Sequence, residues 1–146
     1  MGRAGGAGRR GPRLRGACRS GVPFTSEHQV LGHGTREITA TIVHRVLAEL
    51  GAEAQVLLWN AVPYHPHHPG EPESNRPPTA AELAACHELL NPVVAGRTPV
   101  AVGQTAARAL LKLRAAVVVV RHPAFGGKAA FAAGLEAVLR GELGAR

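Results

Sequence analysis

Three short segments of the sequence hold side chains that could bind or polarise a ligand. Phe24 lies in Gly-Val-Pro-Phe-Thr-Ser, where the preceding proline stiffens the chain. Asn60 ends an apolar run, and a buried amide needs a hydrogen-bonding partner. His122 follows the run of valines over 117–120 and precedes Pro123. These three residue types can stack on a ring, read a hydrogen-bonding edge and donate a hydrogen bond or a proton.

A glycine pair and a lysine open the last predicted helix. Gly126, Gly127 and Lys128 form this segment, and a helix N-terminus of such composition attracts phosphate. It is not a P-loop, because no glycine stands five residues ahead of Gly127 and Ala129 replaces the hydroxyl that would bind a metal. The segment therefore predicts a local phosphate contact.

Each candidate also has a purely structural explanation. Phe24 beside proline could be a plug in the core. Asn60 could close a turn by bonding its own backbone. His122 could be a partly exposed loop histidine. No single residue therefore predicts a function, and the argument depends on their combination.

The composition narrows the chemistry further. All ten acidic residues are Glu, so a catalytic carboxylate would have to be Glu. Cys18 and Cys86 are too few for a disulfide framework or a four-thiolate metal centre, and a reduced, cytoplasmic setting is expected. His65, His67 and His68 are interrupted by prolines and have no Cys or Asp beside them. We therefore predict neither a bound metal nor an iron–sulfur cluster.

The net charge of +7 arises at the N-terminus. Residues 1–20 contain six arginines and no acid, and subtracting six from +7 leaves about +1 for the remaining chain. This Gly-, Ala- and Arg-rich segment is predicted to be disordered. A basic arm that follows phosphates, a transit peptide and a mis-annotated start of the reading frame are its three interpretations. Residues 21–146 are predicted to form one domain, and no apolar run approaches the roughly twenty residues of a membrane span.

The spacing of apolar residues predicts alternating helices and strands. Helices are predicted from Thr35 to Gly51, from Thr79 onward, over 104–113 and over 128–139, with strands over 56–62, 99–102 and 117–120. This alternation is typical of a parallel sheet with right-handed crossovers, whose ligands bind at the carboxyl ends of the strands. Asn60 and His122 are therefore expected at the same edge of the sheet.

The order of these motifs resembles the uracil-DNA glycosylase superfamily. The motifs are Gly-Val-Pro-Phe, the strand ending in Asn60, the proline-rich loop closing with Asn-Arg-Pro-Pro-Thr at 75–79, and Val-Arg-His-Pro before the last helix. The resemblance covers about residues 16–140 and looks closest to the iron–sulfur-type branch of bacteria and archaea and its cluster-free relatives. It implies an α/β fold, a three-layer sandwich with a short parallel sheet.

The resemblance also implies a role for each candidate. Phe24 would stack on a flipped-out uracil, Asn60 would bind its Watson–Crick edge, and His122 would stabilise negative charge on the departing base. The loop of His122, Pro123 and Ala124 would press into the DNA minor groove. The other DNA contacts expected are Arg76, Gly126, Gly127 and Lys128.

The sequence departs from the family pattern at its beginning. A Gly-Glu-Ala-Pro-Gly type turn should lie just ahead of Gly16, where only Pro12 matches, and no carboxylate precedes Glu27. The first strand and the water-positioning acid are therefore expected to be missing from this chain. Tyr64 stands where the iron–sulfur branch has a cluster cysteine, and Ala124 replaces the usual serine without changing the role expected of the loop.

We therefore predict a monomeric DNA-repair enzyme that hydrolyses the N-glycosidic bond of uracil or a similar deaminated base. Its partner would be DNA that contains such bases. The alternative is a non-catalytic protein of the same fold that binds DNA or a base. A third interpretation is an incomplete translation of an active enzyme, which would be neither very stable nor efficient.

Overall fold

The computed structural model describes residues 22–34, 36–64, 66–71, 74, 76–113 and 116–143. The N-terminal arm predicted over 1–20 lies outside these residues, as does Thr35. Along the described chain the elements are α1 Glu27–Leu31, α2 Ile38–Glu49, the 3-10 helix η1 Glu53–Gln55, α3 Ala80–Ala85, α4 His87–Val94, β1 Val100–Val102, α5 Gln104–Leu111, β2 Val118–Val120 and α6 Lys128–Leu139.

The sheet of the described residues consists of β1 and β2, which pair in parallel. Val100 faces Val118 and Val102 faces Val120 in the register. Hydrogen bonds continue past the ladder at both ends, from Val118 N–H to the Pro99 carbonyl and from Gly103 N–H to the Val120 carbonyl, the latter at 3.0 Å. The predicted α/β class with a short parallel sheet is therefore confirmed.

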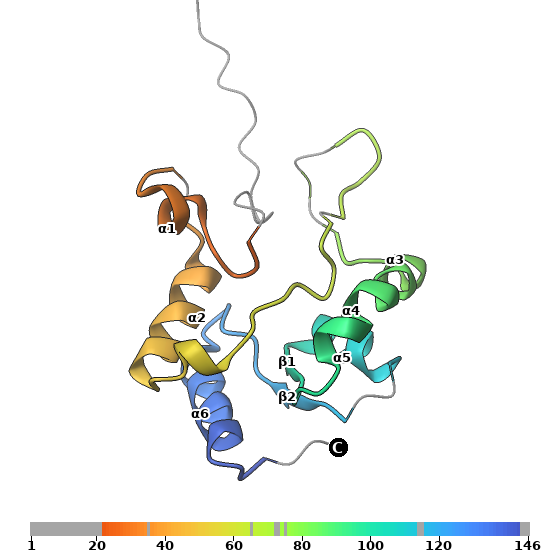
Figure 1. The fold of residues 1–146 in the computed structure, drawn as a ribbon. Helices are drawn as coiled ribbons and strands as arrows, with labels where there is room; N and C mark the ends of the chain where they lie inside the picture. Colours follow the sequence, from red (N-terminus) through yellow and green to blue (C-terminus); the bar gives the residue numbers. More distant parts are fainter. Residues whose placement is uncertain are drawn as a thin grey trace, which may run out of the picture.

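Helices cover the two faces of this sheet. Because successive side chains of a strand point to opposite faces, Val100 and Val102 pack with α2 and α6, while Ala101 packs with Ala107 and Leu110 of α5. Figure 1 shows α2 and α6 on one side of β1 and β2, and α4 and α5 on the other. The arrangement gives the three layers that the family resemblance implied.

The predicted strand over 56–62 is wrong. The chain over 56–60 follows an extended course after η1 (Figure 1) but pairs with no strand among the described residues. Val56 and Leu58 pack against the cluster between α2 and α6, whereas Leu57 and Trp59 are exposed. A continuous apolar run predicted burial on both faces, but the chain buries only one side of this segment.

Most predicted helices are present with modified ends. The α6 bounds match the prediction, α5 ends two residues early at Leu111, and α2 has Glu37 as its N-cap and is followed by Gly51 at a φ of +63°. Thr79 caps α3 as predicted: Glu82 N–H donates to its hydroxyl and its own N–H donates to the Glu82 carboxylate. The single predicted helix after Thr79 divides at the buried Cys86 into α3 and α4.

Candidate functional site

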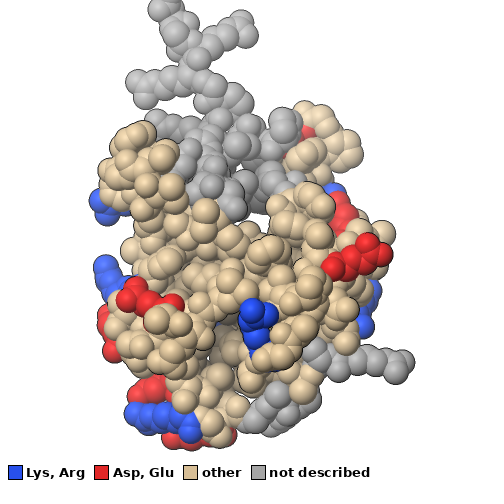
Figure 2. Space-filling view, in the orientation of Figure 1, with Lys and Arg blue, Asp and Glu red and all other residues tan. Residues whose placement is uncertain are grey.

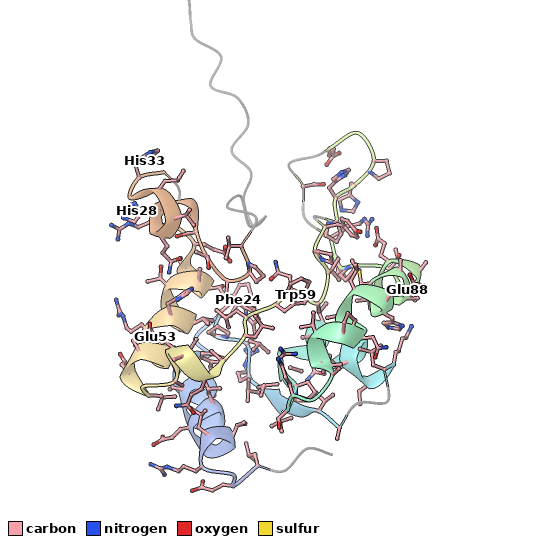
Figure 3. The ribbon with its side chains drawn as sticks, in the orientation of Figure 1. Phe24, His28, His33, Glu53, Trp59 and Glu88 are labelled. Carbon is pink, nitrogen blue, oxygen red and sulfur yellow. The ribbon has the colours of Figure 1, made fainter. Side chains whose placement is uncertain are left out.

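The bases of three candidate loops meet in one apolar cluster. Phe24 is packed against this cluster, as is Leu58, two residues before Asn60. Val120, two residues before His122, is one of its buried members. Segments far apart in the sequence are therefore held on one core. In Figure 3, Phe24 and Trp59 lie in the middle of the view, while His28, His33 and Glu88 lie at the periphery.

Phe24 occupies the third position of a tight turn. Thr25 N–H donates to the Val22 carbonyl at 3.2 Å, Pro23 stands at the second position, and Phe24 has a φ of +50°. This is the pattern of a type II turn, which ordinarily has glycine where Phe24 stands. The Thr25 hydroxyl lies 3.3 Å from His44 Nε2 on α2 and donates to the Pro23 carbonyl at 3.0 Å. The turn therefore holds the half-buried Phe24 with its backbone in an unusual conformation.

Asn60 ends the extended segment as a half-buried residue. Among the described residues its side-chain amide makes no hydrogen bond with another group. A partly buried amide without a partner keeps both its donor and its acceptor available to a ligand. Asn60 is thus suited to pair with a polar edge.

His122 follows β2 directly and has a defined tautomer. Ala124 N–H donates to His122 Nδ1 at 3.2 Å, so in the neutral ring the proton is assigned to Nε2. Burial lowers the pKa of His122 below 6.5, and the positive charge of Arg121 lowers it further. At neutral pH His122 is therefore an uncharged ring that presents an Nε2–H donor.

Pro123 and Ala124 begin the loop that connects His122 with α6. The Pro123 side chain is fully buried, whereas Phe125 is 99% exposed. Gly127 N–H donates to the Ala124 carbonyl at 3.1 Å, and φ is positive at both residues between them, +53° at Phe125 and +76° at Gly126. These signs are those of a type I′ turn. The loop thus anchors itself through Pro123 and presents Phe125 to the outside.

Phe24 and Phe125 are the two non-glycine residues of the described chain with a positive φ. A left-handed conformation of this kind costs a non-glycine residue roughly 1–2 kcal/mol, and such strain clusters at functional sites. Phe125 was not among the residues predicted from the sequence. The two glycines after Phe125 were the signal available for it, because they predict a turn and turns lie at the protein surface.

Arg76 is held by the protein itself. Its guanidinium donates to Glu82 Oε2 and Oε1 at 2.8 and 2.6 Å and to the carbonyls of His67 and Pro77. Its own N–H donates to the Pro66 carbonyl. These bonds tie the proline-rich loop to the N-terminus of α3. The guanidinium thus contributes to the shape of this loop, and the expected DNA contact of Arg76 stays a prediction.

The remaining expected contacts lie at the start of α6. Gly126 and Gly127 lead into the helix, Gly127 is its N-cap, and Lys128 is its first residue and is exposed. On the face drawn in Figure 2, charged side chains lie mostly along the margins, with a small basic patch near the middle. Within the described residues, no group of three or more His, Cys or Glu is arranged to hold a metal, and His65 and Cys18 lie outside them. No described helix has the length and apolarity to cross a membrane.

Comparison with protein families gives one match. A model of the Uracil DNA glycosylase superfamily matches residues 8–137, a range that contains Phe24, Asn60 and His122. This agrees with the range of about 16–140 over which the motifs resemble that family. The match also includes residues 8–21, which lie outside the described part of the chain. Searches of curated proteins and of solved structures gave no match.

Proposed function

Because this chain belongs to the uracil-DNA glycosylase superfamily, we propose that it removes uracil, or a similar deaminated base, from DNA by hydrolysis. The observation that supports the proposal most is the tautomer of His122, whose Nδ1 accepts from Ala124 N–H and leaves a hydrogen on Nε2. A neutral donor in a partly buried site suits a leaving group that becomes negative. The proposal needs no metal or cluster and takes the protein as a cytoplasmic monomer.

The proposed step breaks the bond between the sugar C1′ and N1 of the base. The electron pair stays on the base, which leaves as an anion, while the sugar becomes oxocarbenium-like. Water adds to C1′, and the proton it releases ends on the departed base. A hydrogen bond from His122 Nε2 to a base oxygen would stabilise the developing charge, and one such donor is typically worth roughly 3–4 kcal/mol.

Recognition of the base is assigned to Phe24 and Asn60. Phe24 would stack on the extruded ring, which offsets part of the few kcal/mol that unstacking costs. The Asn60 amide has both a donor and an acceptor, so a fixed orientation pairs with uracil and mismatches cytosine, whose edge reverses them. That its amide has no partner among the described residues supports this role.

The loop after His122 is assigned to the DNA. Phe125 would enter the space left by the extruded base, as exposed apolar side chains do in proteins that kink DNA. Pro123 and Ala124 would follow the minor groove. Gly126, Gly127 and Lys128 would meet a phosphate at the N-terminus of α6, where helix geometry favours anions.

Release of labelled uracil from a single-stranded and a duplex oligonucleotide tests the proposal. The wild-type chain should release uracil, and His122→Ala should slow release by roughly 10²- to 10³-fold with DNA affinity nearly unchanged. Asn60→Asp should weaken the preference for uracil, because a carboxylate cannot donate to the base. If wild type binds uracil-containing DNA but releases no base, the chain is the non-catalytic binder; equal rates in all three proteins would overturn the residue assignments.

A further inference from the structure

The five aromatic side chains of the chain are distributed unusually. Among them only Phe131 is fully buried, while Trp59 is 41%, Tyr64 68% and Phe125 99% exposed. Aromatic residues ordinarily contribute most to a core through their large apolar area. Here the core is aliphatic, and the exposed rings follow Leu58, Asn60 or His122 closely in the chain. They are therefore available to stack on something outside the protein.

Tyr64 lies beside a hollow that the base-recognition residues do not use. The hollow has a volume of about 220 Å³ and is lined by Val62, Tyr64, Pro66, His67, Arg76 and Glu82. Its apolar lining comes from the chain just after Asn60. Its polar lining comes from His67 and from the Arg76–Glu82 ion pair. The hollow thus combines an aromatic face with apolar and hydrogen-bonding walls.

The wall of the hollow that Arg76 and Glu82 form is fixed in place. Arg76 spans the loop through bonds to Glu82 and to the carbonyls of His67 and Pro77. Glu82 is tied in turn to Thr79 N–H at 2.7 Å. A wall held by this many hydrogen bonds loses little conformational freedom when a ligand enters. This polar wall of the hollow is therefore preformed.

We propose that this hollow binds an unpaired nucleobase of the strand that carries the target base, stacked on Tyr64. The inference rests on the proposed function. Tyr64 lies four residues beyond Asn60, so the two residues are at most about 14 Å apart along an extended chain. Roughly four stacked nucleotides of one DNA strand span this distance. Stacking on an aromatic ring accepts any base, because every base has a π face. The preferred substrate is then single-stranded or locally unpaired DNA.

Stacking can be measured without base release. The probe is a single-stranded oligonucleotide with a tetrahydrofuran abasic analogue at the target position and 2-aminopurine one to four nucleotides away on either side. Wild type should quench the fluorescence at one of these positions, Tyr64→Phe should keep the quenching, and Tyr64→Ala should lose it. Tyr64→Ala should also weaken single-strand affinity about 5- to 150-fold, with little change for the matching duplex.

Leu111→Ala is the matched control, because Leu111 is similarly exposed on α5 and lies outside the hollow. The Leu111→Ala protein should quench the 2-aminopurine fluorescence and bind the single-stranded oligonucleotide as wild type does. If Tyr64→Ala quenches as wild type does, or if both DNA forms lose affinity equally, the inference is wrong. If thymidine monophosphate alone removes the quenching at low concentration, the hollow binds a free nucleotide and not a flanking base. Uracil release by wild type is measured separately, so the inference can fail while the proposed function stands.

Discussion

Gly103 lies against His122 at the carboxyl ends of the two parallel strands. A methyl group at Gly103 would come within 3.1 Å of His122 Cβ and 3.5 Å of Cδ2. On the other side, a methyl group at Gly127 would overlap the His122 carbonyl oxygen. His122 is thus in close contact with two glycines, and a side chain at either position would force a shift.

Gly103→Ala should displace the His122 ring by a few tenths of an ångström and slow base release about tenfold or more, since small misplacements of reacting groups are costly. The backbone of Gly103, with a φ of +84° and a ψ of 175°, lies in a region that is essentially restricted to glycine, so alanine there adds strain of roughly 1–3 kcal/mol. Uracil-release rates and thermal unfolding measure the two effects separately.

Gly96→Ala is the control for that strain, because Gly96 has a φ of +69° and open space around its Cβ position. The Gly96→Ala protein should also lose stability, because its φ is positive, and should keep the rate of base release. A Gly103→Ala protein as active as Gly96→Ala would show that the Gly103 contact does not position His122.

The pKa of His122 should be below 6.5 and should rise in Arg121→Gln, because this substitution removes a neighbouring positive charge. It should not return fully to 6.5, since burial is the larger cause. An NMR titration, with the His122 signal assigned from a His122→Gln spectrum, measures the shift. Arg108→Gln, on α5, is the control and should leave the titration unchanged.

The same shift predicts how stability depends on pH. The folded state binds a proton at His122 less readily than the unfolded state, so the unfolded state holds more protons as pH falls below 6.5. The free energy of unfolding should therefore fall as the pH falls from 6.5 toward the lowered pKa. His122→Gln should lack this pH-dependent contribution. Denaturant unfolding of both proteins at several pH values tests this prediction. Identical pH profiles for wild type and His122→Gln would contradict it.

Glu82 should make the fold more sensitive to acid. Its hydrogen bonds from Arg76 and Thr79 lower its pKa from 4.5 to about 2. This contribution to stability is complete above 4.5 and is lost as pH falls toward 2. Glu82→Gln should therefore unfold at a lower temperature at pH 7 but lose less stability than wild type over that window. Glu88→Gln, an exposed carboxylate on α4, should behave as wild type in calorimetry.

Phe125 should contribute to base release from duplex DNA and contribute little to the stability of the fold. Because Phe125 is 99% exposed with a φ of +53°, Phe125→Gly should leave stability unchanged or raise it by roughly 1 kcal/mol. Uracil release from duplex DNA should fall about tenfold, since extrusion of a paired base costs a few kcal/mol that an inserted side chain offsets. Release from single-stranded DNA should change less. An equal loss on both substrates would contradict the wedge role.

Local patterns were sufficient to predict several elements. The capping box at Thr79 and Glu82, the apolar spacing of α2 and α6, and the valine run that forms β2 all depend on neighbours within a few residues. The motifs around Phe24, Asn60 and His122 likewise indicate the family, because their order along the chain can be read without the structure. The sequence therefore determined the fold class, the positions of α2, α5, α6, β1 and β2, and the order of the motifs that indicate the family.

Tertiary structure decided the rest, because the deciding contacts join distant residues. The segment over 56–62 has strand composition, but a strand needs a paired neighbour, and no residue pattern within the segment supplies one. Arg76 has the sequence context of a free cation, and only the fold pairs it with Glu82. The tautomer of His122 depends on the backbone turn at Ala124, and its position depends on Gly103 at the end of the other strand. Spacing along the chain cannot encode such contacts, because they exist only after the sheet and its helices have packed.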